Sequence, residues 1–176
     1  MLKIVLISIG SIIAAILIIA AFMEKEYSIS SEIIINRPKN IVFSFIKDIR
    51  NQEKYSKWVM ADPKVNMIYT GTEGTVGFTT AWNSELKSVG VGEQEITQIF
   101  EGEELDMEIR FEKPFKMVSK AVTITQAVNE NQTKYINKFF TKSPYPMNIM
   151  TPIMKKMLVK DMDETSWNLK NILEKN

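Results

Sequence analysis

The side chains that could do chemistry in this chain are mostly apolar, and the chemistry they indicate is the binding of an apolar molecule. The chain has 11 methionines, whose flexible and polarizable side chains suit an adaptable apolar pocket. We expect six large side chains on inward faces of predicted strands and of a C-terminal helix to line such a cavity, the alternative being that they simply fill the core. These residues are Trp82, Phe111, Tyr135, Phe139, Met154 and Met157.

Two amides could orient a molecule bound in that cavity. Gln94 and Asn137 both fall on strand faces that we assign inward. Because an unpaired buried amide costs about 1–3 kcal/mol, each is expected either to hydrogen-bond a ligand or to pair with a neighbouring side chain or a buried water. No carboxylate is singled out as a catalytic base, so the sequence names no catalytic residue.

The composition excludes several classes of site. The chain has 0 Cys and 0 His, which excludes disulfides, cysteine nucleophiles and Ser-His-Asp triads. No carboxylate cluster has the spacing of a metal site, so we expect neither a metal nor a cofactor. With 22 Lys and Arg against 21 Asp and Glu, the chain lacks the basic excess of a nucleic-acid-binding protein.

A glycine pattern in the middle of the chain resembles a phosphate-binding loop. Gly71, Gly74 and Gly77 follow a G-x-x-G-x-x-G spacing. A phosphate loop needs a helix immediately after it, and no helical pattern follows these glycines. We therefore expect turns at these positions and no phosphate site.

Residues 1–24 are expected to form an N-terminal transmembrane anchor. Residues 4–22 carry no charge, and as a helix this run rises roughly 28 Å, close to the thickness of a bilayer core. A cleaved signal peptide is the alternative, but the apolar run exceeds the usual stretch of about 7–15 residues. Lys3 and the amino terminus favour a cytoplasmic start, which predicts a single-pass membrane protein with its domain on the extracytoplasmic side.

Residues 25–176 are predicted to form one α+β domain. A one-sided antiparallel sheet must bury its apolar face, and the C-terminal helix is the only partner long enough to cover it. The sequence therefore predicts a curved sheet wrapped around that helix, with a hollow between them. The expected elements are a strand at 27–36, helices at 38–49 and 50–58, strands at 65–70, 76–82, 89–100, 104–112, 117–128 and 133–141, and a helix at 151–173.

Several segments carry a resemblance to a known family. Within 33–63, a strand and a proline-led helix with aromatic residues are followed by a W-x-x-x-D-P element at 58–63, and a Y-x-G-x-x-G-x-V-G element at 69–77 precedes Trp82. With the segments 89–96 and 167–174, these resemble the polyketide cyclase/dehydrase family of the START-like (SRPBCC) superfamily, in its membrane-anchored bacterial form. The resemblance implies the helix-grip fold.

The resemblance also implies what such a domain could do. The first hypothesis is a membrane-tethered domain that binds a hydrophobic or lipid-like small molecule between the sheet and the C-terminal helix. The second is a polyketide cyclase or dehydratase-like enzyme that works by positioning, without histidine. The third is a structural or partner-binding domain with a filled core. The expected partners are the small molecule and the membrane.

Overall fold

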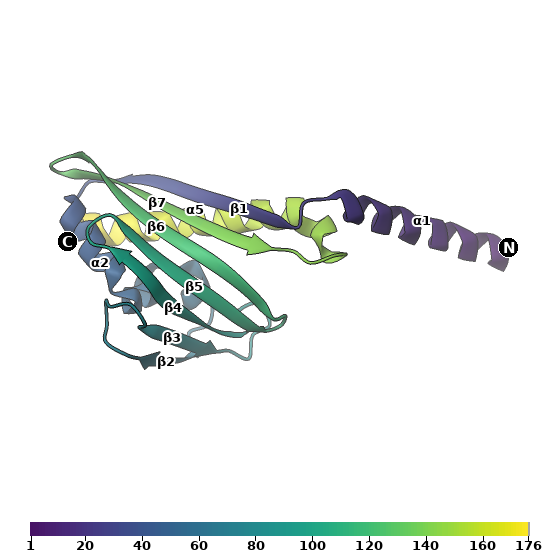
Figure 1. Ribbon diagram of the computed structural model, residues 1–176, viewed down its shortest axis with the longest axis horizontal. Helices are drawn as coiled ribbons and strands as arrows, with labels where there is room; N and C mark the ends of the chain where they lie inside the picture. Colours follow the sequence, from purple (N-terminus) through teal and green to yellow (C-terminus); the bar gives the residue numbers. More distant parts are fainter. Residues whose placement is uncertain (176) are drawn as a thin grey trace.

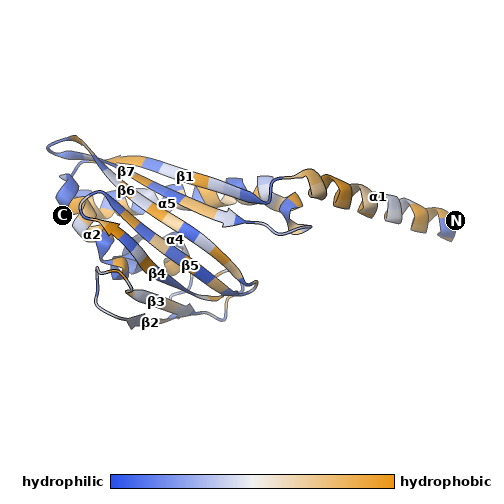
Figure 2. Ribbon diagram, viewed as in Figure 1, coloured by the Kyte–Doolittle hydropathy of each residue, from blue (hydrophilic) through white to orange (hydrophobic). Residues whose placement is uncertain are grey.

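In the computed structural model, which describes residues 1–175, an N-terminal helix projects from a body made of one sheet and several helices (Figure 1). This helix, α1 (Leu2–Phe22), is mostly apolar along its length (Figure 2), and Ala20 is its one buried residue. Within residues 1–175 it is the one helix long and apolar enough to cross a membrane. Its 21 residues span about 30 Å, as the sequence predicts for a membrane anchor or a signal sequence.

The body follows the predicted order of elements. After α1 come β1 (Glu26–Ile35) and four short helices, α2 (Lys39–Lys47), η1 (Ile49–Asn51), α3 (Gln52–Tyr55) and α4 (Lys57–Met60). Six strands follow, β2 (Asn66–Thr70), β3 (Thr79–Asn83), β4 (Val91–Phe100), β5 (Glu104–Lys113), β6 (Met117–Asn129) and β7 (Gln132–Lys142). A short helix η2 (Met147–Met150) leads into the long helix α5 (Thr151–Lys175).

All seven strands form one antiparallel sheet in the order β1-β7-β6-β5-β4-β3-β2. The first strand therefore lies beside the last, and Ile33 of β1 is opposite Tyr135 of β7. Helix α5 runs along β1 and β7 on one face of the sheet (Figure 1), which we call the inner face. This arrangement confirms the predicted α+β helix-grip fold.

The core lies on the inner face, and along β1 the buried residues alternate with exposed ones. Leu169 and Leu173 of α5 pack with residues of β1, α2 and β7, whereas Met162 packs with Tyr27 and Ile29 near the start of β1. A third buried group lies farther from α5, under β3 to β6. It contains Ile49, Phe78, Ile96, Leu105, Met107 and Ala121.

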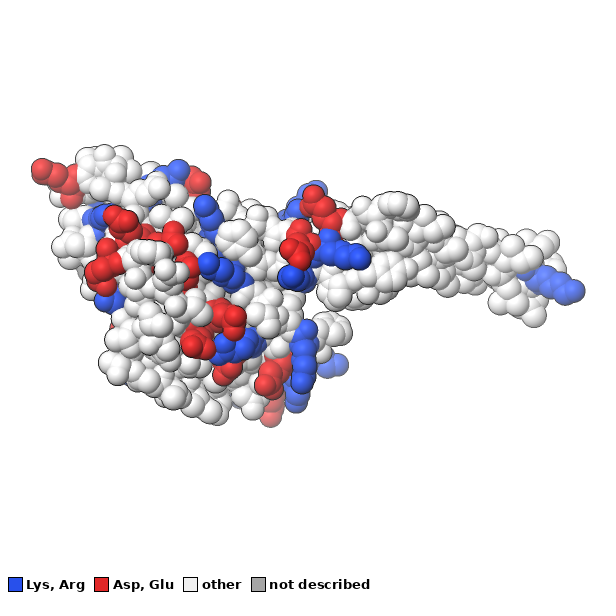
Figure 3. All heavy atoms as spheres, viewed as in Figure 1, with Lys and Arg blue, Asp and Glu red and all other residues white. Residues whose placement is uncertain are grey.

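The outer face of the sheet carries charges of both signs instead of a second layer (Figure 3). The guanidinium of Arg110 donates hydrogen bonds to Glu93 at 2.6 Å, Glu95 at 2.8 Å and Glu108 at 2.6 Å. These hydrogen bonds raise the pKa of Arg110 above its usual value. Because all four side chains are partly exposed, this network contributes little to the stability of the fold. Its main effect is to give the outer face a charged, water-compatible surface.

The C-terminal end of β1 is held by the last turns of α5. Lys170 Nζ donates to the carbonyl of Ile34 at 2.6 Å, and the backbone N–H of Asn36 donates to Glu174 Oε1 at 2.6 Å. Arg37 Nε donates in turn to the carbonyl of Leu173 at 2.6 Å. Side chains therefore occupy edge groups that no strand pairs.

Several elements differ from their predicted bounds by a few residues, and for two of them the local reason is clear. The strand expected at 76–82 begins at Thr79, because Gly77 has φ 86 and the N–H of Phe78 closes a turn onto the carbonyl of Thr75. The helix expected at 50–58 is interrupted at Ser56, whose extended backbone (φ -71, ψ 119) separates α3 from α4. Gly71, Gly74 and Gly77 all have positive φ and lie between β2 and β3, as expected of turns.

Candidate functional site

The six predicted site residues that lie on strands share the inner face of the sheet. Gln94 and Tyr135 are buried, whereas the other four are only half-buried. Asn137 lies opposite Ser31 of β1 and Thr123 of β6, in the middle of the sheet. The half-buried four are Trp82, Phe111, Asn137 and Phe139.

Trp82 and Phe111 form the aromatic part of this face. Their ring centroids lie 5.8 Å apart with an edge-to-face angle of 75°. The indole N–H of Trp82 donates to the carbonyl of Val89 at 3.3 Å, which fixes the ring. The ring lies over Gly92, where an added Cβ would come within 2.6 Å of both Trp82 and the carbonyl of Arg110. Only glycine at this position leaves room for the indole.

Replacing Gly92 with alanine is therefore expected to displace Trp82 and destabilise the fold by roughly 1–3 kcal/mol, as overpacking usually does. Thermal unfolding of the purified chain and its tryptophan emission would measure both effects. Gly102→Ala is the control, because a Cβ there meets nothing within 4 Å and the change bears only the cost of its φ of 76. An unchanged emission spectrum and melting temperature for G92A would contradict this packing.

Polar groups gather on the inner face where β3, β4 and α3 meet. Gln94 Nε2 donates to Gln52 Oε1 at 2.7 Å, and Gln52 Nε2 lies 3.9 Å from the sulfur of Met107. Gln94 thus pairs with a neighbouring side chain, one of its two expected roles. Thr80 lies opposite Gln94, and its buried Oγ1 has no hydrogen-bond partner within the described part of the chain. The Thr80 hydroxyl is thus a buried polar group without a partner in the described part of the chain.

Tyr55 and Tyr135 are buried phenols in the same apolar cluster. Burial raises the pKa of both, for Tyr55 with a smaller contribution from Tyr135 itself. Because an unfolded tyrosine has a pKa of about 10, the neutral phenol is favoured in the folded state. The burial of these neutral phenols contributes fully to stability below about pH 10. This contribution is lost as the pH rises toward the higher pKa values that the tyrosines have in the folded state.

We therefore expect unfolding in alkali, with these two tyrosines ionising only as the fold opens. Phenolate absorbance followed against pH, together with circular dichroism, would measure this step. Tyr135→Phe should remove one late-ionising group, whereas Tyr145→Phe, at a residue 47% exposed, should leave the late step unchanged. A smooth titration of Tyr135 without loss of structure would contradict the expectation.

The two predicted site residues on α5 lie outside its buried stripe. Met154 is 40% exposed and Met157 is 58% exposed, near the start of the helix. The side of α5 that packs on the sheet carries Met162, Leu169 and Leu173 instead. The structure thus brings the six strand residues onto one face but leaves both methionines open to solvent, and their part in binding stays a prediction.

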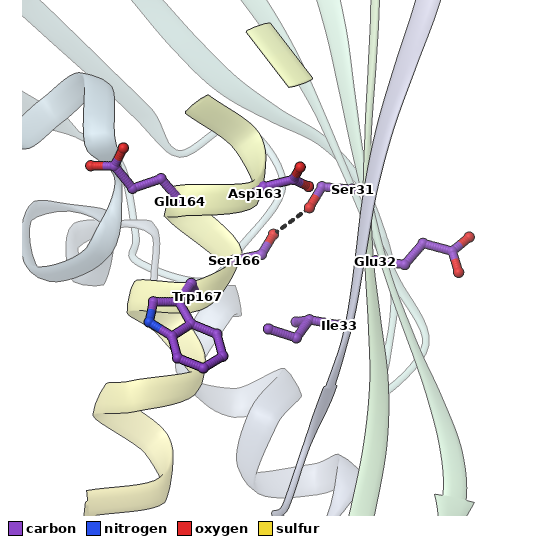
Figure 4. A pocket seen from close by; sticks show the side chains of 7 residues that line it. All are labelled: Ser31, Glu32, Ile33, Asp163, Glu164, Ser166 and Trp167. Carbon is purple, nitrogen blue, oxygen red and sulfur yellow. Dashed lines mark hydrogen bonds between the residues drawn. The ribbon is translucent and has the colours of Figure 1, made fainter. Parts of the chain in front are cut away.

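Two of the open hollows on the surface of the described residues lie along β1, and neither of them contains any of the eight predicted residues. The first, about 510 Å³, lies between β1 and α5 (Figure 4), where the hydroxyls of Ser31 and Ser166 lie 3.0 Å apart and Trp167 flanks the opening. The second, about 640 Å³, involves β1 and β4 to β7 and includes Asp106 and Lys120.

Sequence reasoning missed Gln52, Ser31 and Ser166. Ser31 lies between Ile29 and Ile33 at a spacing of two residues, so the three side chains are on the same face of β1. This spacing could have revealed a hydroxyl on the inner face. Gln52 lies in a short helix, and its pairing with Gln94 spans 42 residues of sequence, so no local pattern could have revealed it.

Comparisons with known proteins identify the fold. No family model matches the chain, and no curated protein sequence matches it. A point mutant of norcoclaurine synthase from Thalictrum flavum, solved with a transition-state analogue, matches with TM-score 0.65 at 7% identity over 86% of this chain and 96% of its own. Ara h 8.0201 matches with TM-score 0.56 at 13% identity, over 86% and 99%. A protein from Arthrobacter aurescens matches with TM-score 0.60 at 18% identity, over 87% and 88%. At these identities, what the likenesses show is the shared helix-grip fold.

Proposed function

We propose that this chain is a membrane-tethered domain that binds a hydrophobic or lipid-like small molecule on the inner face of its sheet, beside α5. The observation that carries the proposal is the partial exposure of Trp82, Phe111 and Phe139. These aromatic side chains share a face with fully buried residues such as Ile96 and Leu105. Aromatic groups that only filled a core would be buried to the same degree, so this part of the face offers contact area to a guest.

The polar groups nearby suit the orientation of a bound molecule. Thr80 Oγ1 is buried and has no hydrogen-bond partner among the described residues, and Gln94, which lies opposite Thr80, pairs with Gln52. On the seven strands, the Asp and Glu residues within the described chain alternate with the inner-face residues and point outward, as Asp106 and Glu108 do between Met107 and Ile109. An inner face with amides and hydroxyls and no strand carboxylate supports binding better than acid–base catalysis.

The tether is the second part of the proposal. Residues 1–24 hold residues 25–176 at the membrane, with the domain on the extracytoplasmic side. The exposed apolar surface of α1 supports this assignment, because an apolar helix outside the fold needs an apolar environment. Tethering raises the local concentration of the binding face near a ligand that is itself dissolved in the bilayer.

Photo-crosslinking of the full chain in lipid nanodiscs tests the proposal, with a diazirine-bearing fatty acid as the probe. We expect labelled peptides from β5 and β7, and competition by unlabelled fatty acid. Phe139→Ala should reduce this labelling, whereas Phe140→Ala, the next residue and 41% exposed, is the matched control on the outer face. Labelling confined to peptides of α1 would contradict the proposed binding site.

A further inference from the structure

The end of α1 is joined to the start of α5 through a single buried amide. Asn148, in η2, is fully buried, and its Nδ2 donates to the carbonyls of Ala20 at 2.6 Å and Met23 at 3.1 Å. The last carbonyls of a helix have no partner within the helix itself. Asn148 therefore caps α1 from a distant part of the sequence and holds η2 against the end of that helix.

Three further contacts fix the same joint. The backbone N–H of Ser143 donates to the carbonyl of Lys25 at 2.7 Å. Lys142 pairs with Glu26 at 2.6 Å, and Lys155 lies 3.6 Å from Glu24. The segment that follows α1 is thus held on one side by the end of β7 and on the other by the first turns of α5. These contacts fix which part of the body lies next to α1.

Several apolar side chains in the segments that meet at this joint are exposed. Phe22 is 88% exposed, and Ile153, at the start of α5, is 54% exposed. Contiguous exposed apolar groups mark a surface that contacts a membrane or another molecule. We call this surface the rim, and it consists of Phe22, Tyr145, Met147, Met150 and Ile153.

We propose that the rim is a membrane-contacting surface, which lies in the interfacial layer of the same bilayer that α1 spans. The inference rests on the proposed function, because it takes α1 as an anchor. The rim adjoins the last turn of α1, so it meets the lipid where that helix leaves the hydrocarbon. Lys25 and Lys156 are exposed and form no ion pair with any described residue, which leaves them available to headgroup phosphates.

This placement gives the proposed ligand a short path. Met154 and Met157 continue the exposed apolar surface from Met150 and Ile153 along α5. A lipid-like molecule that leaves the bilayer at the rim would meet these exposed methionines on its way to the inner face. The rim therefore extends the proposed function, because it identifies the membrane next to the domain as the source of the ligand.

Spin labels test the inference directly, because the chain has 0 Cys and each added cysteine is unique. Single variants Met150→Cys and Ile153→Cys, each nitroxide-labelled in full-length chain in nanodiscs, report accessibility to oxygen, which enters lipid, and to a water-soluble nickel chelate. Trp167→Cys is the matched control, since Trp167 is on the same helix and is 55% exposed, nearly the same as Ile153. Ile13→Cys reports whether α1 is in the bilayer.

The outcomes separate the rim from the anchor. We expect the labels at 13, 150 and 153 to favour oxygen and the label at 167 to favour the nickel chelate. If only the label at 13 favours oxygen, the rim is not a membrane surface, although the anchor stands. If the label at 13 favours the nickel chelate, both the anchor and the rim are wrong.

Discussion

Replacing Ile9 and Ile13 together with lysine is expected to release the chain from the membrane. Both residues lie near the middle of α1 and are about half exposed, so the lysines would disturb no packing within the fold. Each lysine at the centre of a spanning helix costs about 2.5–3.5 kcal/mol, whereas each Ile or Leu contributes about 0.3–0.6 kcal/mol. Two lysines thus offset most of the insertion free energy of α1. Sedimentation of membranes after an alkaline carbonate wash would measure the loss.

The control for this experiment is Ile9→Leu with Ile13→Leu, which keeps the apolar character of α1 and should stay in the membrane pellet. The intact mass of the wild-type chain separates the two interpretations of α1 that the sequence leaves open. A full-length mass supports a retained anchor. A mass that lacks the first residues through about the end of α1 would show a cleaved signal peptide and contradict the tether.

Leu169→Ala should produce the largest loss of stability among substitutions in α5. Leu169 has 0% exposure and packs in one cluster with Ile35, Val42 and Tyr135, where it fastens the helix to the sheet. Truncating a buried leucine costs about 2–5 kcal/mol, a large part of the roughly 5–15 kcal/mol that holds a domain together. Denaturant unfolding followed by circular dichroism would measure the change.

Ile153→Ala is the matched control on the same helix, because Ile153 is 54% exposed and its truncation removes little packing. We expect its effect to stay within about 0.5 kcal/mol, as for most surface substitutions. Equal losses for the two variants would mean that α5 is not held to the sheet through Leu169.

The order of elements and the inward faces could be predicted because both follow from local periodicity. The alternation of Leu105, Met107, Ile109 and Phe111 with charged residues predicts β5 and its inner face, and the structure has both. The inward placement of Gln94 is confirmed for the same reason. Its partner Gln52 could not be predicted. Strand alternation indicates which face of the sheet a side chain is on, but it does not indicate which residue that side chain contacts.

Helix α5 shows the limit of periodicity most clearly. Its sequence carries apolar residues on two sides, the buried stripe of Met162, Leu169 and Leu173 and the exposed Met154 and Met157. Hydrophobicity alone ranks both sides as candidates for burial, and only the packing of β1 against α5 selects one. The joint at Asn148 could not be predicted either, since a single asparagine after two prolines gives no signal of the distant helix that it caps.

The contacts that hold the end of β1 also affect how two copies of the chain can pair through their sheet edges. A strand at the border of a sheet can pair with an edge strand of a neighbouring molecule. Lys170 and Glu174 occupy the backbone groups of Ile34 and Asn36 that a second copy would need. These two contacts therefore make the C-terminal end of β1 less able to pair with a strand of another copy.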